Sequence, residues 1–243
     1  KNIMELDALS ALGIFRMSPA RSATDARFPF GLGAEGLHEI IAASFGDMPA
    51  ATGFALTMSQ IKSGVAVWVN QTITEMNYGR VSPLGLTQLR PSAPPMLIAR
   101  TRRLESALWA IEEAVQSRAV SLVIGEIPDL NFTASRRLAL ASKRCGVPIL
   151  LLMPHTRQGS TAAVARWRIS TQPSCHNRYD PNAPGPIRWQ AVLERARQLP
   201  HITPVNFTLE LNDETLSLSV VPGLASDTAE ASTHTWPQYG TAP

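Results

Sequence analysis

One of the buried apolar runs in this sequence ends in a carboxylate. Glu126 closes the run Ser-Leu-Val-Ile-Gly-Glu at residues 121–126. Nucleotide-binding α/β proteins bind their ligands at the carboxyl ends of parallel strands, and carboxylate oxygens are ligands that Mg²⁺ accepts there. The type and place of Glu126 therefore point first to metal-assisted phosphate chemistry.

The phosphate-binding loop that such chemistry needs is not found in the sequence. A P-loop reads Gly-x-x-x-x-Gly-Lys-Ser/Thr, and its backbone N–H groups and Lys hold the phosphates. The corresponding stretch, residues 42–53, has no Lys and only the isolated glycines Gly46 and Gly53. None of the three lysines of the chain follows a glycine. We therefore predict no catalytic residue, cofactor or metal, and we interpret Glu126 as a vestigial metal position.

A group of cations forms the clearest charged pattern. Arg136, Arg137, Lys143 and Arg144 stand in two pairs seven residues apart. Seven residues are close to two helical turns, so the pairs stack into one basic stripe if the segment is helical. Such a stripe suits DNA phosphates or an acidic partner, and the alternative is a solvated helix face.

Further cations follow the last buried run. Arg157 lies in a short loop segment, and Arg166 and Arg168 flank Trp167. Alternating cations and aromatics suit stacking on single-stranded bases, which makes these three arginines candidate contacts to DNA or an acidic partner. In a strand, however, Trp167 and Ile169 would share the core-facing side and leave the arginines outward.

The N-terminal residues predict an amphipathic helix. Its apolar positions include Leu6, Leu9, Leu12 and Phe15 at roughly helical spacing. These side chains are candidates for self-association, with packing on the chain's own core as the alternative.

The C-terminal residues 222–243 are rich in Ala, Ser, Thr and Pro and predict a disordered tail. Trp236 and Tyr239 are isolated aromatics in this tail. They are candidates for a partner-docking motif, and incidental composition is the alternative.

Buried runs alternate with helical patterns and predict an α/β fold with a doubly wound, mainly parallel sheet. The expected parallel strands are 37–42, 65–69, 96–99, 121–127 and 149–153, and the expected helices are 2–16, 52–63, 104–117 and 133–145. We expect Gly64 to cap the second of these helices and Thr133 to begin the last. Apolar–polar alternation at 164–169, 187–193, 207–211 and 216–220 predicts antiparallel strands added at one edge.

Bulk properties narrow the class of protein only moderately. The chain has 243 residues, 44% of them hydrophobic and 17% charged, with a net charge of +3. The length suits one α/β domain with extensions, and the low charge suits a surface covered by partners. Two cysteines, no membrane-length apolar run and no signal-peptide pattern predict a cytoplasmic protein without a membrane contact.

Several sequence blocks together resemble the ImuA family, which is related to RecA and SulA and assists mutagenesis in the bacterial SOS response. The matching blocks are residues 36–40, 108–114, 123–126, 133–141, 162–169 and 185–189. The resemblance covers about residues 30–212, and Trp-Ala-Ile-Glu-Glu with Arg-Arg-Leu-Ala-Leu-Ala is its most specific part.

The resemblance implies a RecA-like core without ATP hydrolysis. In RecA-type ATPases a catalytic Glu follows the second strand, whereas residues 67–72 contain none. It also implies an N-terminal helix and linker at 1–27, a core at 28–221 and the tail at 222–243. His155 takes the place of the RecA residue that senses nucleotide, and 156–161 falls where RecA has its second DNA-binding loop.

The function implied by the resemblance is that of an adaptor in damage-induced, error-prone translesion synthesis at the nucleoid. The expected partners are an ImuB-like Y-family pseudo-polymerase, an error-prone replicative-type DNA polymerase and RecA, with weak DNA binding and a homo-oligomer also allowed. The alternatives are a SulA-like division inhibitor that binds FtsZ and an ATPase with a degenerate loop.

Overall fold

The computed structural model describes residues 36–59, 64–89, 95–177, 179–180, 182–197, 204–212 and 218–221. The predicted N-terminal helix with Leu6, Leu9, Leu12 and Phe15 lies outside these residues, as does the predicted tail with Trp236 and Tyr239.

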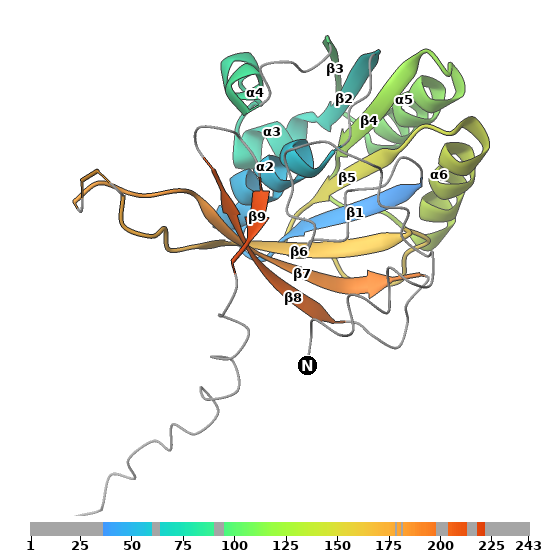
Figure 1. Ribbon diagram of the computed structural model, residues 1–243. Coiled ribbons are helices and arrows are strands. Elements are labelled where there is room, and N and C mark those ends of the chain that lie inside the picture. Colours follow the sequence, from blue (N-terminus) through green and yellow to red (C-terminus); the bar gives the residue numbers. More distant parts are fainter. Residues whose placement is uncertain are drawn as a thin grey trace, which may run out of the picture.

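The described strands form one mixed sheet (Figure 1). They are β1 (Leu37–Ala42), β2 (Val65–Gln71), β3 (Met96–Thr101), β4 (Val120–Glu126), β5 (Ile149–Met153), β6 (Ala165–Gln172), β7 (Arg188–Ala196), β8 (Val205–Leu211) and β9 (Leu218–Val220). Their order across the sheet is β3-β2-β4-β5-β1-β6-β7-β8-β9. The predicted α/β class and mainly parallel sheet are confirmed.

The strand order places the ends of β1, β4 and β5 side by side. β5 pairs in parallel with both β1 and β4, and every residue of β1 and β5 is buried. Continuous apolar runs are typical of parallel strands covered on both faces. Consequently the carboxyl ends of these strands, with the loops that follow them, form a single edge of the sheet.

The antiparallel part begins one strand later than the sequence pattern predicts. Residues 164–169 alternate like an antiparallel strand, but β6 pairs in parallel with β1 on one side. Its other side pairs antiparallel with β7, and β8 and β9 continue that pattern. Buried and half-buried side chains alternate along β6, and this produces the alternating sequence pattern in a strand with one parallel neighbour.

Helices cover both faces of the sheet. They are the short 3₁₀ helix η1 (Phe45–Asp47) and the α-helices α2 (Met48–Met58), α3 (Thr72–Tyr78), α4 (Pro83–Leu89), α5 (Leu104–Gln116) and α6 (Phe132–Cys145). α2 packs with Trp68, Trp167 and Trp189 in one core cluster, which confirms the predicted core position of Trp167. α5 and α6 form the other cluster on the opposite face, whereas α3 and α4 lie near α2 (Figure 1).

A glycine permits a close contact between α2 and the sheet. A Cβ on Gly53 would stand 2.8 Å from Cζ2 of Trp189, which is closer than real Cβ contacts. A helix-interior glycine normally costs stability, so here it is explained by the indole that lies against it.

Some helix boundaries differ from the predicted ones. α2 spans Met48–Met58 and its C-cap is Ser59, so Gly64 does not cap it. α6 is capped by Asn131, whose side chain accepts a hydrogen bond from the Ala134 N–H, and Thr133 is already helical. The predicted end of α6 is confirmed, because Gly146 follows it with a φ of 70°. Helices α3 and α4 are not among the helices expected from the sequence.

Candidate functional site

The predicted metal position lies in a closed environment at the carboxyl end of β4. Glu126 is 4% exposed, and Trp68 Nε1 donates a hydrogen bond of 3.3 Å to its Oε2. Burial raises the pKa of Glu126 to about 7, the Trp68 hydrogen bond opposes this rise, and the charge of Glu75 adds to it. A carboxyl group that is half protonated at neutral pH is a weak ligand for Mg²⁺, which prefers ionised oxygens.

A second carboxylate lies nearby and has the opposite character. Glu75 of α3 accepts hydrogen bonds from Asn70 Nδ2 at 2.6 Å and Arg100 Nε at 2.8 Å, and Arg80 pairs with it at 3.4 Å. Burial works to raise the pKa of Glu75, but these hydrogen bonds and the two cations outweigh it and lower the pKa. Glu75 is therefore the ionised member of the pair, and its charge is held by Arg100.

Glu75 is not among the site residues expected from the sequence. A carboxylate does follow the second strand, four residues after Gln71, although residues 67–72 contain none. The short helix α3 carries it back toward β3, where Arg100 stands. The signal available in the sequence was Glu75 itself, close behind a buried strand and followed by Arg80.

Aromatic side chains occupy the edge around the end of β5. The ring of Phe45, in the β1–α2 connection, lies 4.9 Å from the Tyr78 ring and 6.5 Å from the His155 ring. Burial raises the pKa of Tyr78, and the charge of Glu126 adds to the rise. The stretch that would carry a phosphate-binding loop therefore contributes an aromatic contact and a capping box between Ser44 and Asp47.

A buried ion cluster links β1 to the segment after β5. Glu39 is fully buried and accepts hydrogen bonds from Thr161 Oγ1 at 2.7 Å and from Arg166 Nε at 2.7 Å. Arg157 Nη2 also approaches Glu39 Oε1 at 3.3 Å. A buried carboxylate requires cationic or hydrogen-bonding partners. This cluster is not among the sites expected from the sequence, although a Glu inside the buried run 37–42 was the signal for it.

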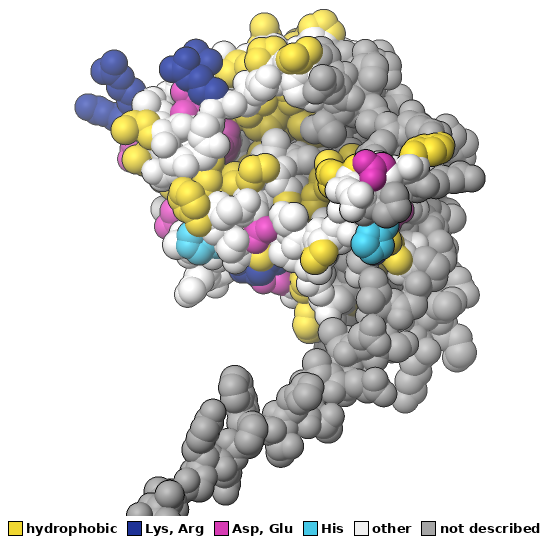
Figure 2. Space-filling model, turned by 90° about the vertical axis from the view of Figure 1, so that its left-hand side faces the viewer, with side chains coloured by type: hydrophobic (Ala, Val, Ile, Leu, Met, Phe, Trp, Pro, Cys, Tyr) yellow, Lys and Arg dark blue, Asp and Glu magenta, His cyan; other side chains and the backbone are white. Residues whose placement is uncertain are grey.

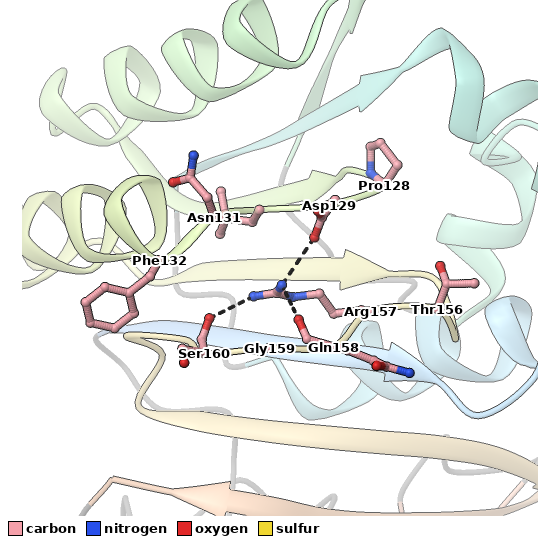
Figure 3. A pocket seen from close by; sticks show the side chains of 10 residues that line it. Pro128, Asp129, Asn131, Phe132, Thr156, Arg157, Gln158, Gly159 and Ser160 are labelled. Atoms are coloured by element: carbon pink, nitrogen blue, oxygen red, sulfur yellow. Dashed lines mark hydrogen bonds and ion pairs between the residues drawn. The ribbon is translucent and has the colours of Figure 1, made fainter.

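A surface cavity of about 460 Å³ lies between the β4–α6 and β5–β6 connections (Figure 3). Arg157 Nη1 reaches across it to Asp129 Oδ1 at 3.2 Å, and Nη2 donates to the Ser160 carbonyl at 3.2 Å. Asp129 is exposed, as is the ring of Phe132 at the first turn of α6. The cavity thus includes most of the segment 156–161, which was expected at the place of RecA's second DNA-binding loop, but its arginine already has protein partners.

Three of the candidate contacts to DNA or an acidic partner form ion pairs within the protein. Arg157 is 4% exposed, Arg166 pairs with Glu39 at 2.7 Å, and Arg168 pairs with Glu194 across β6 and β7. Arg166 and Arg168 do lie on the face opposite Trp167, as the alternation predicts. These cations therefore stabilise the packing of β6 and its loop and do not form an open basic surface.

The other four candidates remain on the surface of α6. Arg136, Arg137, Lys143 and Arg144 are all exposed, and Arg137 Nε pairs with Glu112 Oε2 of α5 at 3.0 Å. The predicted basic stripe is therefore present, and its nearest neighbour is the acidic surface of α5.

The edge strand β3 has apolar side chains that reach the surface. Leu97 is 62% exposed and Ile98 39% exposed, on opposite faces of the strand, with Ile73 and Met76 of α3 also exposed. Figure 2 shows hydrophobic side chains at several places on the side of the molecule that carries α3 and α4. An edge strand with unpaired backbone groups and exposed apolar side chains can pair with an added strand.

The remaining chemistry-bearing residues form no evident site in the described part of the chain. Cys175 is exposed, and His176 forms an isolated bridge with Pro184 in the β6–β7 connection. Within the described residues no group of three or more His, Cys, Asp or Glu is placed to hold a metal ion. No described helix combines the length and the apolar character that crossing a membrane requires.

Comparisons with known proteins add no identification. No protein-family model matches the sequence, and no curated protein matches it either.

Proposed function

We propose that this chain is a non-catalytic, RecA-like adaptor of damage-induced, error-prone translesion DNA synthesis. In this role it links an ImuB-like Y-family pseudo-polymerase to an error-prone replicative-type polymerase, in contact with RecA. The sequence blocks that resemble the ImuA family support this proposal. The mainly parallel sheet with C-terminal antiparallel strands is consistent with a RecA-like fold in general.

The side chains at the carboxyl ends of the parallel strands support a role in binding partner proteins in preference to nucleotide hydrolysis. Glu126 is buried and half protonated at neutral pH, and Glu75 is occupied by Arg100. Phe45, Tyr78 and His155 fill the edge where the phosphates of a nucleotide would have to lie. A nucleotide would therefore have to displace aromatic contacts and would find no Lys there.

The observation that carries the adaptor proposal is that β3 is the edge strand of the sheet formed by the described residues. Leu97 and Ile98 remain exposed on both faces of this strand, although its inner neighbour β2 is almost completely buried. Burying two such side chains in an interface contributes up to about 1.5–3 kcal/mol each before the costs of association. An extended apolar segment of a partner protein, added as a further strand, satisfies the backbone groups and covers these side chains.

The cations that follow β3 indicate which charge the partner segment should carry. Arg102 and Arg103 follow the strand and are exposed, and Arg100 pairs with Glu75. A partner segment with acidic residues beyond its apolar part would meet these cations. We place the contact with the ImuB-like protein at this edge.

The test is the affinity of the full chain for the ImuB-like protein of its host. The double variant Leu97→Lys, Ile98→Lys places charge on the edge and is expected to weaken binding by about tenfold or more. Ile187→Lys is the matched control, because Ile187 is also exposed at 46% but lies before β7. Circular dichroism of each variant establishes that the fold is kept.

Two results would overturn parts of the proposal. Equal affinities for the parent and the double variant would remove the contact from β3. Binding to FtsZ together with no binding to the ImuB-like protein would replace the adaptor by a SulA-like division inhibitor.

A further inference from the structure

The outer face of α5 has an exposed tryptophan between negative charges. Trp109 is 63% exposed and stands four residues from Glu105 and four from Glu113. Residues four apart are neighbours on one helix face. A tryptophan normally buries much of its large apolar surface, so its exposure here marks a surface suited to a partner.

The outer face of α6 has the same arrangement with positive charges. Leu140 is 59% exposed and stands four residues from Arg136 and four from Arg144, and Lys143 adds a further exposed cation. Both helices thus have an exposed apolar side chain with a charged residue four positions before it and four positions after it. The charges are negative on α5 and positive on α6.

The two helices lie side by side and share a groove. The Arg137–Glu112 ion pair joins α6 to α5, and both helices pack on the same face of the sheet (Figure 1). The groove has a volume of about 560 Å³. It is lined by Glu112, Arg137, Leu140, Ala141, Lys143 and Arg144. Among the described residues, none forms a salt bridge with Glu105, Glu113, Arg136, Lys143 or Arg144.

We propose that this face binds a second copy of the same chain. A two-fold axis that runs along the helices, between α5 and α6, places α5 of one copy over α6 of the other. The acidic α5 of each copy then faces the basic α6 of the other, so this contact occurs twice. Trp109 of each copy lies near Leu140 of its partner. The surface is therefore self-complementary in charge and covers both exposed apolar side chains.

The negative charge on α5 and the positive charge on α6 favour a second copy of the chain over other partners. A DNA backbone or an acidic protein would be attracted to Arg136 and Arg144 but repelled by Glu105 and Glu113 on the adjacent helix. A second copy is attracted by both helices at once. This inference does not depend on the proposed function, because it uses the face opposite α2 and leaves the β3 edge open.

Light scattering on the full chain after size-exclusion chromatography tests the proposal. At micromolar concentration we expect twice the chain mass of 26.3 kDa. An acidic variant carries Arg136→Glu, Lys143→Glu and Arg144→Glu, and a basic variant carries Glu105→Lys and Glu113→Lys. Each variant alone places like charges across the interface, so each is expected to be monomeric.

Mixing the two variants provides the decisive control. The acidic variant has two acidic helices and the basic variant two basic ones, so the equimolar mixture is expected to form heterodimers. These should dissociate in about 1 M salt, where charges are screened within roughly 3 Å. A monomeric parent protein, or variants that keep the parent's oligomeric mass, would overturn the proposal, and the latter result would favour the predicted N-terminal helix as the contact. If one variant misfolds, the parent mass and the loss of dimer in Trp109→Ser still decide the question.

Discussion

Glu126 offers the sharpest prediction about how the carboxyl edge is built. In the folded protein its pKa is raised from 4.5 to about 7, because the carboxyl group is buried near the charge of Glu75. Ionising it in the folded state therefore costs up to about 3 kcal/mol relative to the unfolded chain. The hydrogen bond from Trp68 to the carboxylate is already part of that balance.

The sign of the pH dependence follows from the raised pKa. Between pH 4.5 and about 7 the folded protein binds more protons at this group than the unfolded chain does. The contribution of Glu126 is therefore fully present below pH 4.5 and is lost as the pH rises to about 7. Glu126→Gln keeps an oxygen that accepts from Trp68 Nε1 but removes the charge. The variant should exceed the parent by about 2–3 kcal/mol in free energy of unfolding at alkaline pH, and by much less under acidic conditions.

Urea unfolding followed by tryptophan fluorescence, repeated from mildly acidic to mildly alkaline pH, measures this difference. Glu75→Gln is the matched control, because the pKa of Glu75 is lowered and its charge is held by Arg100 and Arg80. That variant should lose stability at neutral pH. A Glu126→Gln variant that is less stable than the parent at alkaline pH would refute the reasoning, because the carboxylate would then be ionised and held by a favourable partner.

Two further predictions concern packing. Gly53→Ala should destabilise the protein by about 1–3 kcal/mol in urea unfolding, because its Cβ would overlap the Trp189 ring. Gly85→Ala in α4 is the control: its Cβ would lie 3.6 Å from Ser82, an ordinary contact, so this change should be neutral or stabilising, and equal losses would contradict the close approach. Glu39→Gln should cost about 3–5 kcal/mol, because it leaves the buried Arg157 and the half-buried Arg166 without the charge of the Glu39 carboxylate. An unchanged midpoint for Glu39→Gln would show that the cluster adds little to stability.

The sequence predicted well those elements whose signal is local. Residues 149–153 form a strand with the predicted bounds because a short apolar run between Pro148 and Pro154 leaves few alternatives. The helix 104–117 was found within one residue because its apolar stripe covers more than three turns. The missed helices α3 and α4 have seven residues each, too few for a clear periodicity, and they carry Gly, Pro and Thr.

The candidate site was less accessible to sequence reasoning because its contacts are not local. Glu39 is separated by 118 residues from Arg157 and by 127 from Arg166, and only the strand order brings them together. Arg157 and Arg166 were identified as candidates from the sequence, but Glu39, which forms ion pairs with both, lies within an apolar run and was not identified. The basic stripe of α6 was predicted because its spacing lies within one helix, whereas the acidic neighbour on α5 was not.

The most direct test of the adaptor account is a binding titration of the full chain against the ImuB-like protein of its host, with and without residues 222–243. The account predicts saturable binding by the full chain and retention of that binding after removal of the tail, because β3 lies outside residues 222–243. Loss of binding with the tail would keep the adaptor but move its contact to the region of Trp236. If neither the full chain nor the chain without residues 222–243 binds the ImuB-like protein, the central claim is contradicted.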